Sequence, residues 1–185
     1  MPSACGYTWS LELDAVIRDE AQAAAVPLDL AYTFIAVESA FDPAARNLSA
    51  IEDSVGLLQL NRRGGQGQGF SVAQLQDPAF NLRVGLPAIR RAFEQVWTPA
   101  ITPFEFIYQV AIRSGHPGPV ARTDPRILNI ARVWSCFFPA AGVLAPLGSD
   151  AADWRPGPAH SLAAFPILLL SLLATPALAV LRWRR

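Results

Sequence analysis

The apolar and polar positions of the chain predict a run of helices with one short extended interruption. Residues 9–25 are amphipathic at helical spacing and stop before Pro27. A strongly apolar helix follows from Pro27 to Glu38, where the segment 41–43 ends it. Three later helix starts share one signature, a capping side chain followed by proline: Asp77-Pro78, Thr102-Pro103 and Asp124-Pro125. The pattern therefore predicts a mainly α domain.

The extended interruption lies at residues 55–60, a short apolar run that predicts an edge strand or a β hairpin. Residues 64–69 are all glycine or glutamine, and they predict a loop. A phosphate-binding loop is not indicated, because no Lys-Ser/Thr pair follows these glycines and no strand leads through them into a helix.

A different pattern marks the C-terminal part of the chain. Residues 162–181 carry no charge, and their length is what a bilayer-spanning helix requires. Pro166 and Pro176 leave a buried core helix or a re-entrant hairpin open as alternatives. The preceding segment is rich in proline and glycine and predicts a linker. We therefore expect four parts: a domain at residues 1–138, a linker at 139–160, a transmembrane helix at 161–182 and a basic tail at 183–185.

The composition narrows the classes of function. A chain of 185 residues holds one domain of common size plus an appendage, and such a core needs no metal or disulfide to fold. The formal net charge is zero and every basic residue is arginine, so nothing indicates nucleic-acid binding. Cys5 and Cys136 lie outside any paired-cysteine framework, which favours two free thiols over a bridge. The N-terminus shows no secretory signal.

Glu38 is the residue on which a functional interpretation depends. Desolvation at the end of an apolar helix raises the pKa of a carboxyl group, which lets it deliver a proton at neutral pH. It stands in Glu38-Ser39-Ala40-Phe41-Asp42-Pro43, and Gly56-Leu57-Leu58-Gln59 follows downstream. These phrases resemble the lysozyme-like lytic transglycosylases of the soluble-lytic-transglycosylase and goose-type groups, in which Glu-Ser precedes Gly-Leu-Met-Gln. The resemblance covers roughly residues 25 to 135.

The resemblance implies a fold, a substrate and a set of site residues. The fold would be a lysozyme-like α-rich domain with a short β hairpin, and the substrate would be the glycan strands of peptidoglycan, with no cofactor and no metal. Glu38 would be the catalytic acid and then the base. Leu58, in the place of the family's methionine, would line the sugar groove, while Gln59 would hydrogen-bond substrate or Glu38. Asn61 and Gln66 in the following loop would also contact glycan.

One family element is altered in this chain. The soluble-lytic group carries Ala-Tyr-Asn-Ala-Gly, whose tyrosine reaches the catalytic acid, whereas this chain reads Ala111-Ile112-Arg113-Ser114-Gly115. Tyr108 lies one helical turn earlier on the face of Ile112, and we expect it to substitute for that tyrosine. The alternative is an ordinary core tyrosine whose hydroxyl reaches solvent or bonds a backbone carbonyl. Residues 75–85 keep a further family phrase, Leu-x-Asp-Pro-x-x-Asn, with a mostly structural role.

The main functional prediction is a lytic transglycosylase that cleaves the MurNAc-GlcNAc β-1,4 bond and leaves 1,6-anhydro-MurNAc. A hydrolysing muramidase (lysozyme) is the alternative, with Glu52 or Asp53 positioning water, although a solvated loop is the favoured interpretation for both residues. The third candidate is a catalytically silent peptidoglycan-binding membrane protein. In each case a single-pass anchor would hold the domain in a lipid bilayer, that of a host cell or of a bacteriophage virion, facing the cell wall.

Overall fold

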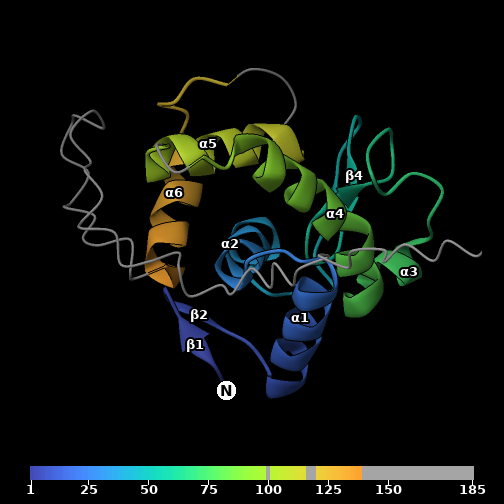
Figure 1. Ribbon diagram of the computed structural model, residues 1–185. Helices are drawn as coiled ribbons and strands as arrows, with labels where there is room; N and C mark the ends of the chain where they lie inside the picture. Colours follow the sequence, from blue (N-terminus) through green and yellow to red (C-terminus); the bar gives the residue numbers. More distant parts are fainter. Residues whose placement is uncertain (99–100, 116–119, 139–185) are drawn as a thin grey trace, which may run out of the picture.

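The computed structural model describes residues 1–98, 101–115 and 120–138. Its helices are α1 (Leu11–Ala23), α2 (Leu28–Ser39), α3 (Val72–Gln76), α4 (Pro78–Val96), α5 (Pro103–Ser114) and α6 (Pro125–Phe137). Its strands are β1 (Ser3–Ala4), β2 (Tyr7–Thr8), β3 (Arg46–Leu48), β4 (Asp53–Val55) and β5 (Leu60–Asn61). In Figure 1, α2 lies in the middle with α1, α4, α5 and α6 around it. The prediction of a mainly α domain with short β structure is confirmed.

Each of the three capped proline motifs begins a helix, as the sequence predicted. The Asp77 carboxylate accepts a hydrogen bond from the N–H of Phe80 at 2.7 Å and starts α4, and Thr102 accepts from the N–H of Glu105 at 3.3 Å and starts α5. Asp124 caps α6. A capping oxygen satisfies a backbone donor that the first turn leaves unpaired, and proline at the next position has no N–H to satisfy.

α2 is the central helix because its sequence is apolar on nearly every side. Residues 30–36 are all buried, as expected for a helix surrounded by others. α6 is tied to the start of α2, since the indole N–H of Trp134 donates to the Asp29 carboxylate at 2.8 Å. The surrounding helices therefore hold α2 in place, and its last turn positions the half-buried Glu38 near the surface of the domain.

The predicted extended interruption is a three-stranded antiparallel sheet in the order β3-β4-β5. Asn47 lies opposite Ser54, and Val55 lies opposite Leu60. A small second core packs against the sheet and contains Val55, Leu60 and Leu75. The sequence pattern indicates β4 and β5 approximately, but it does not indicate β3 and α3, which are too short to show a period.

β1 and β2 form a hairpin that the sequence analysis did not predict. Cys5 and Gly6 are its two turn residues, and both have positive φ, 59° and 84°. Cys5 forms a disulfide with Cys136, in the last turn of α6. The expectation of two free thiols was therefore wrong. The fold joins cysteines 131 positions apart, and no local spacing signals such a pair.

The C-terminal predictions fall outside the described residues. This holds for the linker at 139–160, the membrane helix at 161–182 and the tail at 183–185. Among the helices that the structure describes, none is long and apolar enough to cross a membrane. The membrane helix therefore stays a prediction from the sequence.

Candidate active site

Glu38 lies in the last turn of α2, where the helix leaves the core. Ala40 ends the helix in the left-handed conformation, and its N–H donates to the Ala36 carbonyl at 3.1 Å. The hydroxyl of the buried Ser39 donates to the Ile35 carbonyl at 3.0 Å. Backbone and side-chain bonds thus close the helix end immediately beside Glu38 and fix the point from which its carboxyl group extends.

The surroundings of Glu38 suit proton transfer. The side chain is half-buried, and burial raises its pKa to about 7, with the negative charge of Glu52 adding to the shift. A group with this pKa holds a proton in part of the population at neutral pH and can also release it. The raised pKa expected from the position at a helix end is therefore present in the structure.

Glu52 precedes β4, and two side-chain donors hold its carboxylate. Asn47 Nδ2 donates to one oxygen at 2.9 Å, and the Ser54 hydroxyl donates to the other at 2.6 Å. Glu52 lies in the loop before β4, as expected, but it is half-buried rather than fully solvated. Because its charge contributes to the pKa of Glu38, the fold brings these two carboxyl groups near each other.

Asp53, the next acidic residue, is bound on both sides by arginine. Arg46 Nε lies 2.9 Å from one carboxylate oxygen, and Arg62 Nη1 lies 2.5 Å from the other. The residue is 6% exposed on β4, so the expectation of a solvated loop was wrong here. The hydrogen bond from Arg46, with help from Arg62, holds the pKa of Asp53 below its ordinary value. Such a carboxylate is a weak base.

The phrase at residues 56–59 forms a tight turn between β4 and β5. Gly56 has a φ of +81°, and a Cβ at this position would lie 2.1 Å from the Leu75 carbonyl oxygen and 2.3 Å from Asn81 Nδ2. Asn81 is fully buried in α4, donates to two backbone carbonyls and accepts from the N–H of Leu58 at 2.9 Å. Glycine and Asn81 together fasten this turn to α4, in keeping with the structural role predicted for the phrase at 75–85.

Two predicted substrate-binding residues, Gln59 and Leu58, lie on this turn. The Gln59 side-chain NH₂ donates to the carbonyls of Ala45 at 3.2 Å and Gly56 at 2.9 Å. Both amide hydrogens of Gln59 thus bond within the turn. A hydrogen bond from Gln59 to substrate or Glu38 would therefore use the side-chain amide oxygen as acceptor. Leu58 is half-buried, and the missing side chain of Gly85 makes room for it.

Asn61 and Gln66 stand in the segment that follows the turn. Asn61 Oδ1 accepts from the N–H groups of Asp53 at 3.3 Å and Arg63 at 2.8 Å. The exposed Gln66 donates through Nε2 to the Ser114 carbonyl at 3.2 Å. Asn61 therefore orders the start of the glycine loop, and Gln66 connects that loop to the end of α5. Contact of either side chain with glycan stays a prediction.

Tyr108 is a buried residue of α5 whose hydroxyl is turned to the backbone. It donates to the Val120 carbonyl at 2.8 Å, and the Arg122 guanidinium lies over its ring, 4.8 Å from the centroid. A phenol has one proton to donate, and here the backbone accepts it. The structure therefore favours the core alternative for Tyr108 over substitution for the family's tyrosine.

Residues 15–102 match the family model of the transglycosylase SLT domain. This segment belongs to that family. It contains α2 with Glu38, the three-stranded sheet and α4 with Asn81, and it is a lysozyme-like domain of the lytic transglycosylase type, a class that acts on peptidoglycan. A search of curated proteins found no matching relative.

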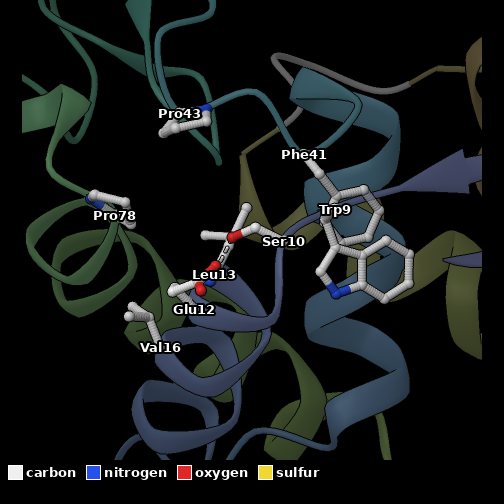
Figure 2. Close-up of a pocket in the computed structure, with 8 residues that line it drawn as sticks. All are labelled: Trp9, Ser10, Glu12, Leu13, Val16, Phe41, Pro43 and Pro78. Carbon is white, nitrogen blue, oxygen red and sulfur yellow. Dashed lines mark hydrogen bonds between the residues drawn. The ribbon is translucent and has the colours of Figure 1, made fainter. Parts of the chain in front are cut away.

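An apolar hollow of about 370 Å³ lies at the start of α1 (Figure 2). Its lining comes from three segments: Trp9, Ser10, Glu12, Leu13 and Val16 before and in α1, Phe41 and Pro43 after α2, and Pro78 of α4. Glu38 is not among the lining residues. The sequence did not predict this hollow, because it arises only where the three segments meet.

Within the described residues, no group of three His, Cys, Asp or Glu side chains is placed to hold a metal ion.

Proposed function

We propose that the SLT domain is a peptidoglycan lytic transglycosylase that cleaves the β-1,4 bond between N-acetylmuramic acid and N-acetylglucosamine, with Glu38 as its catalytic residue. The observation that carries this proposal is the half-buried carboxyl group of Glu38, whose pKa is raised to about 7 by burial. Its place at the end of α2, within the segment that matches the family, supports the same assignment.

Glu38 would act twice in this reaction. In the protonated form it gives its proton to the glycosidic oxygen, and the bond between that oxygen and the muramoyl C1 breaks. The Glu38 carboxylate then takes the proton of the muramoyl 6-hydroxyl, whose oxygen attacks C1 and closes the 1,6-anhydro ring. A pKa near the working pH favours both steps. No water and no second carboxylate are needed, which makes this chemistry an exception to the usual pair of glycosidase carboxylates.

A hydrolysing muramidase is the second candidate, and Glu52 is the observation that favours it. Its negative charge contributes to the raised pKa of Glu38, so the two carboxyl groups interact electrostatically, as an acid and a base in one glycosidase site would. In this candidate Glu52 would position a water molecule in place of the 6-hydroxyl. Asp53 suits that role less, because two arginines hold its carboxylate.

Mass spectrometry of the muropeptides that the purified protein releases from cell walls separates the candidates. A transglycosylase leaves 1,6-anhydro ends, whereas a hydrolase adds water and leaves reducing ends. A protein that binds cell walls and releases no muropeptide would be the glycan-binding alternative, and the proposed function would then be wrong.

The first prediction is that Glu38→Gln abolishes lysis and preserves the fold. The amide keeps the shape of the side chain but has no acidic proton. General acid–base catalysis contributes about 10²- to 10⁴-fold, and because one group serves both steps we expect a loss near the upper end. Glu94→Gln, at an exposed position of α4, is the matched control and should lyse like the wild type. A Glu38→Gln variant that keeps more than about a tenth of the rate contradicts the assignment.

A further inference from the structure

The turn after Glu38 has an unusual backbone conformation. Ala40 and Phe41 are consecutive non-glycine residues with positive φ, 53° and 66°. Residues with a Cβ rarely adopt this conformation, so surrounding contacts must hold it. Glu38 stands two residues before the pair. The contacts that hold this turn therefore also fix the end of α2 from which Glu38 extends.

Five side chains, which we call the aromatic cluster, hold the turn: Tyr7, Trp9, Tyr32, Phe41 and Phe137. Phe41 lies at its centre and is 4% exposed. Its ring stacks on that of Trp9 with centroids 4.1 Å apart. Figure 2 shows these two side chains next to each other. The rings of Tyr7, Tyr32 and Phe137 lie 5.9, 6.1 and 6.2 Å from it. Aromatic pairs at these distances attract each other beyond the burial of their area.

The disulfide fastens two sides of the aromatic cluster. Cys5 is a turn residue of the hairpin that carries Tyr7, and Cys136 directly precedes Phe137. A two-stranded hairpin is marginally stable by itself in water, so the hairpin of β1 and β2 depends on its attachments. Cys136 is exposed and Cys5 is half-buried, which leaves the bond open to attack by a small dithiol.

We propose that Phe41 is a positioning residue for Glu38, and that the Cys5–Cys136 disulfide keeps the aromatic neighbours of Phe41 in place. The activity is therefore redox-sensitive. The inference rests on the proposed function, in which Glu38 is the catalytic residue. A dithiol reductant balances the step: the disulfide takes up two electrons and two protons and becomes two thiols, while the dithiol becomes a cyclic disulfide. The hairpin is then released from α6, and the turn after Glu38 loses part of its support.

The test compares the oxidised full chain with the same protein reduced by dithiothreitol, on a soluble peptidoglycan fragment. We expect kcat to fall about 10- to 100-fold, because small misplacements of a catalytic group have effects of this size. KM should change less than about twofold, since positioning acts on the reaction more than on binding. Reoxidation should restore kcat. The double variant Cys5→Ser/Cys136→Ser should show the low kcat with or without reductant.

Variants of Phe41 test positioning without touching the disulfide. Phe41→Leu should lower kcat in the same way. Phe41→Tyr keeps the ring that stacks on Trp9, so it should keep more of the wild-type kcat than Phe41→Leu. Phe93→Leu is the matched control, because Phe93 contacts the rings of Trp97 and Phe106 on another side of the domain, and it should keep the wild-type kcat.

Hydrogen exchange separates a failure of this inference from a failure of the proposed function, because it needs no activity. The N–H groups of Ala40 and Asp42 donate to the carbonyls of Ala36 and Ser39. They should exchange faster in the reduced protein, while the amides of α4 keep their protection. This result would support the proposal that the disulfide and the aromatic cluster hold the turn, even if Glu38→Gln stays active. Unchanged kcat with unchanged exchange at these two amides would overturn the inference. Loss of helical circular dichroism on reduction would also overturn it, since the disulfide would then support the whole domain.

Discussion

Glu38 has a chemical role and, through its pKa, a cost in stability. Burial raises its pKa from 4.5 to about 7. Below the lower value the group is protonated in the folded and unfolded chain alike. Between the two values only the unfolded chain loses its proton, so the free energy of unfolding falls as the pH rises through this range, and it stays lower above pH 7. A catalytic acid that works near neutral pH therefore destabilises the fold that holds it.

We therefore predict that Glu38→Gln is more stable than the wild type at pH 8 and equally stable at pH 4. The shift of the pKa corresponds to about 3 kcal/mol of unfolding free energy at pH 8. Urea unfolding at both pH values, followed by circular dichroism, measures the difference. Equal differences at the two pH values would mean that packing rather than ionisation separates the variant from the wild type.

Glu52 and Asp53 are adjacent in sequence but have different expected effects. Glu52→Gln removes a negative charge that raises the pKa of Glu38, so that pKa should fall and the alkaline loss of activity should move to lower pH. Under the transglycosylase proposal, the rate at pH 5 should stay close to that of the wild type. Under the hydrolase alternative, the rate should fall at every pH, as far as it does for Glu38→Gln.

Asp53→Asn is the control for this pH profile. It removes the partner of Arg46 and Arg62, so it should lower the melting temperature. It should leave the pH dependence of the rate unchanged at temperatures where the variant is folded. A loss of rate as large as that of Glu38→Gln would instead identify Asp53 as the base of a hydrolase.

At the scale of elements, the turn between β4 and β5 rests on Gly56. Gly56 and Gly6 have nearly the same φ, +81° and +84°, but a Cβ at Gly56 would meet Leu75 and Asn81, while a Cβ at Gly6 would meet nothing within 4 Å. Gly6→Ala should therefore lose only about 1 to 2 kcal/mol of unfolding free energy, for the conformation alone. Gly56→Ala should lose at least about 2 kcal/mol more, because backbone or Asn81 must shift. Equal losses in chemical unfolding would show that the turn can move away from α4.

The elements that the sequence predicted well are those with local causes. Asp77, Thr102 and Asp124 start helices because a cap and a following proline act within one turn, and Glu38 stands at a helix end because the apolar run stops there. The misses depend on which distant segments meet. The arginine partners of Asp53, the backbone acceptor of Tyr108 and the pairing of Cys5 all require the tertiary fold. Helical or strand periodicity carries no information about such contacts.

At the scale of the whole molecule, the domain extends beyond the segment that matches the SLT family. That segment ends at residue 102, yet α5 and α6 complete the core around α2 with fully buried side chains such as Val110 and Val133. The hairpin of β1 and β2 and its disulfide to α6 also lie outside residues 15–102. The hairpin and the disulfide on which the proposed redox sensitivity depends therefore lie outside the segment that matches the family model.

The last prediction concerns residues 161–185, which lie outside the described residues. Their uncharged run at 162–181 has the length of a bilayer-spanning helix, and the proline- and glycine-rich segment before it favours a linker. Deleting 161–185 should therefore convert a protein that partitions into detergent into one that stays in the aqueous phase. The same deletion should leave the lysis of added peptidoglycan near the level of the full chain, because the core residues that the structure describes around α2 all lie within residues 4–138.

A chain that lacks only residues 183–185 is the matched control and should still partition into detergent, since the apolar run remains. Phase separation and turbidity loss of cell walls, measured on the same samples, give both readouts. If the long deletion precipitates or loses helical circular dichroism, the apolar run belongs to the domain core, and the membrane anchor is wrong. If the protein that lacks residues 161–185 stays folded and aqueous but no longer lyses cell walls, these residues contribute directly to activity, which a membrane tether alone would not do.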